Sequence, residues 1–118
     1  MNQLDKFKTF IKDRNENVKV GLVGAGQMGQ GIVAQVSKMY GVELVCIIDR
    51  NQKQLDSAVN RYKKYKENEL LCSDSISALD NVDLDIVIEA TGTPAAGALV
   101  AKNVLNRGIN LILLNVET

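Results

Sequence analysis

The sequence predicts an α/β fold in which a doubly wound parallel sheet of the Rossmann type carries helices on both faces. Three observations lead to this prediction. Apolar runs alternate with helical patterns, a Gly-x-Gly-x-x-Gly turn at Gly24–Gly29 follows the first run, and Asp49 ends the second. Right-handed crossovers between such strands give the strand order 3-2-1-4-5.

Apolar runs supply the strands of this sheet. The first run is dense in valine, which is typical of a buried parallel strand, and the second ends in a carboxylate. The predicted strands are Val18–Val23, Glu43–Asp49, Leu70–Cys72, Leu84–Ala90 and Asn110–Leu114.

Helical patterns fill the gaps between the first strands. The first helix follows the glycine turn and runs to Tyr40, where Gly41 stops it. Its expected inward face holds apolar residues that recur at helical spacing: Met28, Ile32, Val36 and Met39. A charged helix is capped by Asn51 and runs to about Glu67, and the polar stretch 73–79 allows a helical turn.

Two further helices are predicted near the ends of the chain. The last begins with Thr93 as N-cap and Pro94 in its first position, and Gly108 ends it. Its inward residues are expected to be Ala98, Ala101, Val104 and Leu105. Residues 2–14 form a short amphipathic helix, because Leu4, Phe7 and Ile11 share one face, and we expect it to pack against the sheet or a neighbouring element.

Composition limits the class of protein. The chain has 118 residues, 46% of them hydrophobic, which suits one globular domain, and its 14 basic and 14 acidic residues give no basic excess for nucleic acid. No apolar stretch approaches the roughly 20 residues that cross a bilayer, and the start of the chain does not resemble a signal peptide. We therefore expect a cytoplasmic protein with no membrane or nucleic-acid partner.

The cysteines and the chain end complete this outline. Cys46 and Cys72 are expected to be reduced and mostly buried, since they match no metal-ligand spacing and the chain has no histidine. The chain stops at Thr118, directly after the fifth strand. We expect a helix and linker over residues 1–17 and a dinucleotide-binding domain over residues 18–118, which is a fragment of a longer enzyme or an isolated domain.

The glycine turn carries the chemistry. Gly24 permits a tight turn, Gly26 lets a diphosphate approach the backbone, and Gly29 lets the helix pack close to the strand. The helix N-terminus then presents N–H groups to the phosphates. The expected contacts are Gly24, Ala25, Gly26, Gln27, Met28 and Gly29.

Asp49 follows Gly29 by 20 residues, at the end of the second strand. An acidic residue there accepts hydrogen bonds from the adenosine ribose and repels a 2′-phosphate, which favours NAD. Arg50 is able to face that phosphate instead and to stack on the adenine. The residues therefore leave NAD and NADP both open.

The loops after the fourth and fifth strands face the same crevice in a doubly wound sheet. We expect the fourth-strand loop to line the nicotinamide side of the cofactor through Ala90, Thr91, Gly92, Thr93 and Pro94. Asn115 is a further candidate contact. Glu89 receives no catalytic role, and neither catalytic residues nor a metal site is identified.

Four segments together resemble a known family: Val20–Gly29, Ile48–Asn51, Glu89–Pro94 and Leu114–Glu117. They are similar to the N-terminal NAD(P)-binding domain of homoserine dehydrogenase-like oxidoreductases. Within that group the chain looks more like the branch with a C-terminal SAF domain, which includes 1-deoxyxylulose-5-phosphate reductoisomerase-like enzymes. The resemblance covers about residues 17–118.

This resemblance implies NAD or NADP as cofactor, with NADP slightly favoured, and a small-molecule substrate bound through a further C-terminal domain. A homo-oligomer is compatible with it. Homoserine dehydrogenases proper carry a catalytic lysine after the fifth strand, where this chain has Asn115, Val116 and Glu117. True homoserine dehydrogenase activity is therefore not expected.

The sequence favours the cofactor domain of an NAD(P)-dependent oxidoreductase, in which a hydride moves at the nicotinamide. The chain alone is expected to be inactive. The alternative is a non-catalytic nucleotide-sensing Rossmann module. Binding of S-adenosylmethionine is disfavoured, because the glycine loop of methyltransferases usually differs from this six-residue pattern.

Overall fold

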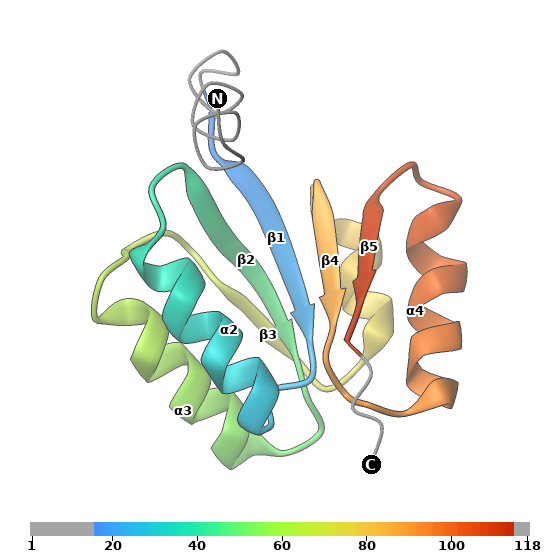
Figure 1. The fold of residues 1–118 in the computed structure, drawn as a ribbon, viewed down its shortest axis with the longest axis horizontal. Helices are drawn as coiled ribbons and strands as arrows, with labels where there is room; N and C mark the ends of the chain where they lie inside the picture. Colours follow the sequence, from blue (N-terminus) through green and yellow to red (C-terminus); the bar gives the residue numbers. More distant parts are fainter. Residues whose placement is uncertain (1–15, 115–118) are drawn as a thin grey trace.

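The computed structural model describes residues 16–114 and confirms the predicted fold (Figure 1). A single five-stranded sheet has the order β3-β2-β1-β4-β5, and every neighbouring pair is parallel. The strands are β1 (Val18–Val23), β2 (Val42–Ile48), β3 (Leu71–Ser73), β4 (Ile86–Glu89) and β5 (Asn110–Leu113).

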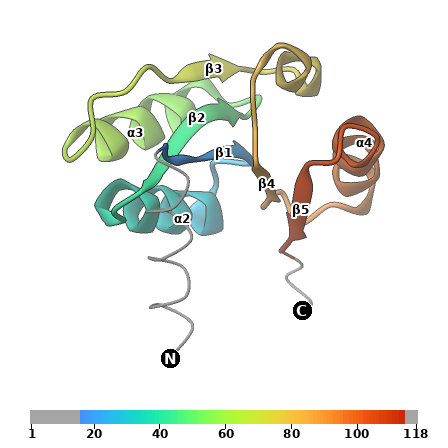
Figure 2. The ribbon, with the colours of Figure 1, turned by 90° about the horizontal axis from the view of Figure 1, so that it is seen from above.

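Helices cover the two faces of the sheet at different places (Figure 2). On one face, α2 (Gln27–Lys38) and α3 (Gln52–Lys63) pack on β1 and β2. On the other face, the 3₁₀ helix η1 (Ile76–Asn81) and α4 (Pro94–Leu105) pack mainly on β4, β5 and the adjacent part of β1 and β2. Each face thus has its own hydrophobic core.

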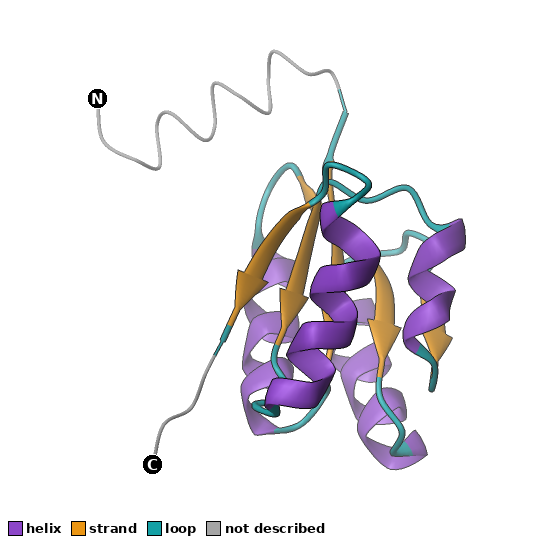
Figure 3. Ribbon diagram, turned by 90° about the vertical axis from the view of Figure 1, so that its right-hand side faces the viewer, coloured by secondary structure: helices purple, strands orange, loops and turns teal. Residues whose placement is uncertain are grey.

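All strands end at the same edge of the sheet (Figure 3). This follows from the parallel pairing, because after each strand the chain crosses back to the opposite edge before the next strand begins. The order of the strands reverses between β1 and β4, so the loops that leave these two strands diverge to opposite faces. Such a switch point is where doubly wound sheets form their binding crevices.

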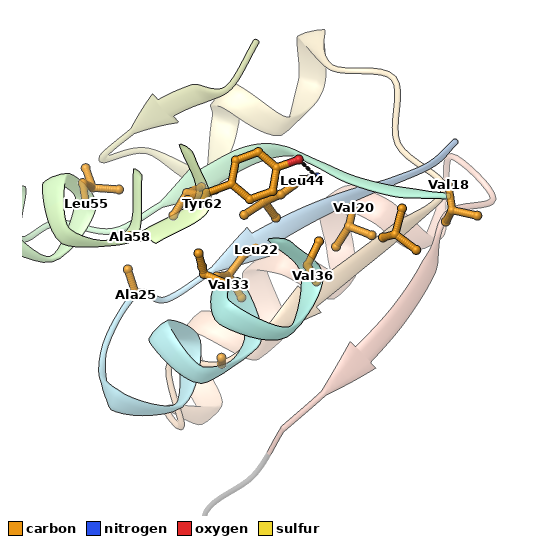
Figure 4. Close-up of a cluster of buried hydrophobic side chains, with 13 residues drawn as sticks. Val18, Val20, Leu22, Ala25, Val33, Val36, Leu44, Leu55, Ala58 and Tyr62 are labelled. Atoms are coloured by element: carbon orange, nitrogen blue, oxygen red, sulfur yellow. Dashed lines mark hydrogen bonds between the residues drawn. The ribbon is translucent and has the colours of Figure 1, made fainter. Parts of the chain in front are cut away.

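The core between the sheet and α2–α3 contains one large aromatic side chain, Tyr62 (Figure 4). It is fully buried, and burial raises the pKa of its hydroxyl. Tyr62 accepts a hydrogen bond from the N–H of Leu44 at 2.9 Å and donates to Asn68 Oδ1, while Asn68 Nδ2 donates to the Leu44 carbonyl at 2.9 Å. β3 begins only opposite Cys46, so these two side chains satisfy the backbone of Leu44 where no strand does.

The predicted inward face of α2 is confirmed at Val36 and differs from the structure at its other three positions. Its buried residues are Gly29, Val33, Val36 and Ser37, whereas Met28 and Ile32 are only partly buried and Met39 is 37% exposed. The contact of Gly29 with the end of β1 sets the rotation of the helix, and the inward face then follows at i, i+4 and i+7 from that residue. The helix also ends at Lys38, two residues before the predicted end.

The inward face of α4 differs from the prediction for a similar reason. Of the predicted residues, Val104 is fully buried and Ala101 is half-buried, whereas Ala98 is exposed and Leu105 is 60% exposed. Val100, which was not predicted, is fully buried. Gly97 lies against Glu89 of β4, and this contact rotates the residues at i+3 and i+7 toward the sheet.

The remaining boundaries differ by small amounts. α3 ends at Lys63 rather than near Glu67, because the chain turns there, with the N–H groups of Tyr65 and Lys66 donating to the Tyr62 carbonyl. β4 is shorter than predicted, and the possible turn at 73–79 is the 3₁₀ helix η1. The predicted caps Asn51 and Thr93 are confirmed, each accepting a hydrogen bond from the third residue after it.

Only one cysteine matches its predicted burial. Cys46 is buried and free, and burial raises the pKa of its thiol to about 11. Cys72 is free but exposed, because it lies on the short edge strand β3. The predicted helix at 2–14 and the residues Asn115 and Glu117 lie outside the described residues, and no helix within residues 16–114 is long and apolar enough to span a membrane.

Replacing Tyr62 by Phe tests the Leu44 contact. The substitution leaves the buried N–H of Leu44 without its partner, so we expect the free energy of unfolding to fall by about 1–3 kcal/mol in urea denaturation. Tyr65→Phe is the matched control, since Tyr65 is 62% exposed and its loss of a hydroxyl changes no buried bond. Equal stability of the two variants would contradict this role of Tyr62.

Candidate functional site

A cavity of about 820 Å³ opens at the carboxyl edge of the sheet, beside the switch point. The ends of β1 and β2 form its floor, and the loops after β2, β3 and β4 form its walls. Its lining residues are Val23, Gly24, Ile48, Asp49, Arg50, Asp74, Ser75, Ile76, Ser77, Thr91, Thr93, Ala95, Ala96 and Leu99.

Two glycines of the turn are required by packing alone. Gly24 has φ of 102°, a left-handed conformation, and a Cβ there would lie 2.9 Å from the carbonyl carbon of Ala90. A Cβ on Gly29 would overlap the carbonyl oxygen of Gly24. These contacts bring α2 against β1 and place the β4 loop beside the turn.

Gly26 differs from these two glycines. A Cβ added there meets no atom within 4 Å, so nothing in the described protein requires a glycine at this position. Gly26 is also the N-cap of α2, and no side chain caps the helix. A glycine that the fold does not need, at the mouth of a helix, fits a backbone that a ligand approaches closely.

The N-termini of the three α-helices of residues 16–114 are treated differently. Asn51 caps α3, and Thr93 caps α4, whose first position is occupied by Pro94. α2 has neither a side-chain cap nor an acidic residue in its first turn. Its N–H groups and positive dipole end are therefore available to an anion.

Asp49 fastens the glycine turn to the end of β2. Its Oδ2 accepts a hydrogen bond from the N–H of Ala25 at 2.7 Å, and its Oδ1 accepts one from the N–H of Asn51 at 2.7 Å. In the amide orientation that satisfies its hydrogen bonds, Gln54 Nε2 also donates to this carboxylate, at 3.1 Å from Oδ2 and 3.2 Å from Oδ1, which leaves about one acceptor site for a further donor. Asp49 thus holds a fixed orientation at the cavity wall while it keeps acceptor capacity for a ligand hydroxyl.

Gln30 is a structural contact that the sequence did not reveal. Its Nε2 donates to the carbonyls of Ala25 and Gln54 at 2.9 and 3.0 Å, and its Oε1 accepts from Arg61 Nε at 2.9 Å. One amide therefore joins the glycine turn, the start of α3 and the body of α3. No sequence pattern marks a single glutamine for this role.

The sequence predicted part of the cavity wall and missed another part. Gly24, Asp49, Arg50, Thr91 and Thr93 line the cavity. The other predicted residues do not line it: Ala25, Gly29 and Ala90 are buried, Gly26, Gln27, Met28, Gly92 and Pro94 are absent from the cavity wall, and Asn115 lies outside the described residues. Whether any of these residues touches a cofactor stays a prediction.

The missed wall follows β3 and comprises Asp74, Ser75, Ile76 and Ser77. These residues had the same signal as the others, since they come directly after a strand of the parallel sheet. No role was predicted for Glu89, which is buried and accepts a hydrogen bond from the N–H of Thr91. Residues 16–114 contain no group of three or more acidic, cysteine or histidine side chains that is able to hold a metal.

The chain is similar in sequence to known proteins. Residues 18–113 match the family described as "Dihydrodipicolinate reductase, N-terminus". Among curated proteins, the chain is 36% identical over 90 residues to a "Glycosyl hydrolase family 109 protein" of Shewanella baltica. That match covers 70% of this chain and 19% of the relative, so the chain spans about a fifth of the length of such relatives.

Solved structures share the fold. A dehydrogenase from Chromobacterium violaceum is 25% identical with a TM-score of 0.65, covering 83% of this chain and 28% of that one. The WlbA dehydrogenase of Chromobacterium violaceum, solved with NADH and UDP-GlcNAcA, is 19% identical with a TM-score of 0.60, covering 84% of this chain and 35% of that one.

Two glycines of α2 give a matched test of the packing of the turn. Gly29→Ala places a Cβ against the Gly24 carbonyl, and we expect a loss of stability of about 2–3 kcal/mol in urea denaturation. Gly31→Ala meets open space in the same helix and should raise stability by about 0.5–1 kcal/mol. Similar effects at both positions would contradict the contact.

Proposed function

The chain belongs to the dihydrodipicolinate reductase N-terminal family, and on that premise we propose that it binds NAD or NADP as the cofactor domain of an oxidoreductase. One observation carries the proposal. The N-terminus of α2 has no side-chain cap and has open space above Gly26, and it directly follows the turn whose Gly24 lines the cavity at the carboxyl edge of the sheet.

The diphosphate of a dinucleotide fits this helix end. The N–H groups of its first turn point out of the helix, and the helix dipole favours negative charge there. No side chain stands at Gly26 to block the approach. The adenosine half would then extend toward Asp49 and Arg50, and the nicotinamide half toward the β4 loop, since the cavity joins these two walls.

In this proposal the residues of this chain bind and orient the dinucleotide. When bound, the nicotinamide supplies the hydride chemistry. Gly26 would admit the diphosphate, Gly24 and Gly29 would hold the turn and the helix in place, and the Asp49 carboxylate would accept ribose hydroxyls. The described residues offer no acid–base pair for a substrate, and a small-molecule substrate would be bound by parts of a longer protein.

Asp49 supports NAD over NADP. Its carboxylate is held by two backbone N–H groups at the cavity wall, and a fixed negative charge there repels a 2′-phosphate. Arg50 also lines the cavity but is exposed, so it is free to turn away. We therefore assign the preference to NAD, whereas the sequence resemblance alone favoured NADP.

We also propose the kind of enzyme and the extent of its binding domain. Glu89–Pro94 and Leu114–Glu117 support an enzyme of the homoserine dehydrogenase-like or reductoisomerase-like kind. The match of residues 18–113 supports a binding domain over residues 18–118.

Gly26→Val tests the phosphate site. The side chain projects into open space, so the fold should persist, with a melting temperature lowered by no more than about 8 °C. It should weaken NADH binding by at least roughly tenfold, because it stands where the diphosphate approaches the backbone. The dissociation constant follows from NADH fluorescence, with Gly31→Ala as control. If folded Gly26→Val binds NADH as tightly as the wild type, the diphosphate does not lie at the N-terminus of α2.

Asp49→Ala tests the choice of coenzyme. Loss of the ribose acceptor and of the repelling charge should shift the ratio of NAD to NADP dissociation constants by roughly tenfold toward NADP. Asp56→Ala removes the same charge from an exposed position of α3 and should leave the ratio unchanged. A shift toward NAD in Asp49→Ala would show that another residue controls the choice.

A further inference from the structure

Glu89 is a buried carboxylate at the end of β4, with 3% of its surface exposed. Its Oε2 lies 3.4 Å from the position of a Cβ on Gly97, so the carboxylate lies beneath the first turn of α4. Burial of a carboxylate requires donors. Glu89 Oε1 accepts from the N–H of Thr91 at 2.8 Å and from the Thr91 hydroxyl.

Glu89 sets the direction of a chain of hydroxyl groups. The single hydroxyl proton of Thr91 goes to Glu89, so Thr91 Oγ1 acts as the acceptor in its 3.1 Å contact with Thr93 Oγ1. Thr91 Oγ1 also accepts from the N–H of Thr93 at 3.2 Å. Both hydroxyl protons are therefore committed along the chain toward Glu89, and both threonines line the cavity.

At this end of the cavity, the side chain of Thr93 therefore presents a hydrogen-bond acceptor to a ligand. Thr93 Oγ1 accepts from the N–H of Ala96 at 3.4 Å and has a second lone pair for a ligand. Pro94 has no N–H to offer an anion at the start of α4. The negative charge of Glu89 lies behind the same loop. This end thus differs in polarity from the open N-terminus of α2, because the Thr93 cap, the missing N–H of Pro94 and the buried Glu89 carboxylate offset the positive end of the α4 dipole.

We infer that Glu89 is a positioning residue that makes the Thr91–Thr93 end of the cavity select a neutral hydrogen-bond donor, such as a carboxamide, over a carboxylate. The inference rests on the proposed function, because it assumes a dinucleotide whose diphosphate lies at α2. It follows that the chain binds NAD in preference to nicotinic acid adenine dinucleotide, in which a carboxylate replaces the carboxamide.

Titration calorimetry of the 118-residue chain with three ligands tests this inference. ADP-ribose lacks the nicotinamide, NAD carries a carboxamide, and nicotinic acid adenine dinucleotide carries a carboxylate. We expect the wild-type chain to bind NAD at least roughly tenfold more tightly than the carboxylate analogue, because the analogue places an anion against an acceptor near a buried charge.

Two variants separate the charge from the acceptor. Glu89→Gln keeps an oxygen for Thr91 but removes the charge, and it should reduce the preference for NAD by at least roughly fivefold. Thr93→Val removes the acceptor and should weaken NAD by roughly two- to tenfold, while ADP-ribose binding stays within about twofold. Thr93→Ser keeps the hydroxyl and should restore the wild-type preference.

The outcomes distinguish the inference from the proposed function. If ADP-ribose and NAD both fail to bind the wild-type chain, the proposed function is wrong and the inference falls with it. If both bind, and the preference for NAD over the carboxylate analogue is absent or is equal in the wild type and the folded variants, the role of Glu89 is wrong while the binding site stands. If Glu89→Gln does not fold, the effect of Thr93→Val on the preference for NAD over the carboxylate analogue decides whether the inference holds.

Discussion

Gly24 lies so close to the loop after β4, and Gly29 at the start of α2 so close to Gly24 after β1, that a Cβ on either residue would collide with backbone atoms. This contact fixes the rotation of α2 and therefore which of its residues enter the core. It also fixes the direction of the helix N-terminus, which lies beside the cavity at the carboxyl edge of the sheet. Asp49 and Gln30 then hold the turn through Ala25 from two sides.

The two ends of the cavity differ in polarity. At one end, the first turn of α2 has N–H groups without a side-chain cap and no acidic neighbour within the helix. At the other end, Thr93 caps α4, and Glu89 lies buried under its first turn. A ligand with a negative centre and a neutral, donor-bearing end is complementary to both, and this gives the proposed dinucleotide a single orientation.

The sequence was sufficient for the fold, because strand periodicity, the glycine turn and capping residues are local signals. It was insufficient for the faces of α2 and α4, because contacts of Gly29 with Gly24 and of Gly97 with Glu89 rotate these helices, and such contacts form only between elements that the fold has brought together. Gln30 was invisible for the same reason, since its partners lie in the turn and in α3. The wall after β3 was within reach of the rule that parallel strands end at the binding crevice.

Backbone amide chemical shifts, followed by NMR while ADP-ribose is added to the chain, test the central claim directly. If a diphosphate binds at the N-terminus of α2, the amide signals of Gln27, Met28 and Gly29 should shift the most and saturate together with those of the Asp49 loop. Shifts that leave these amides unchanged while other regions respond, or no saturable shift at millimolar ligand, would contradict the claim.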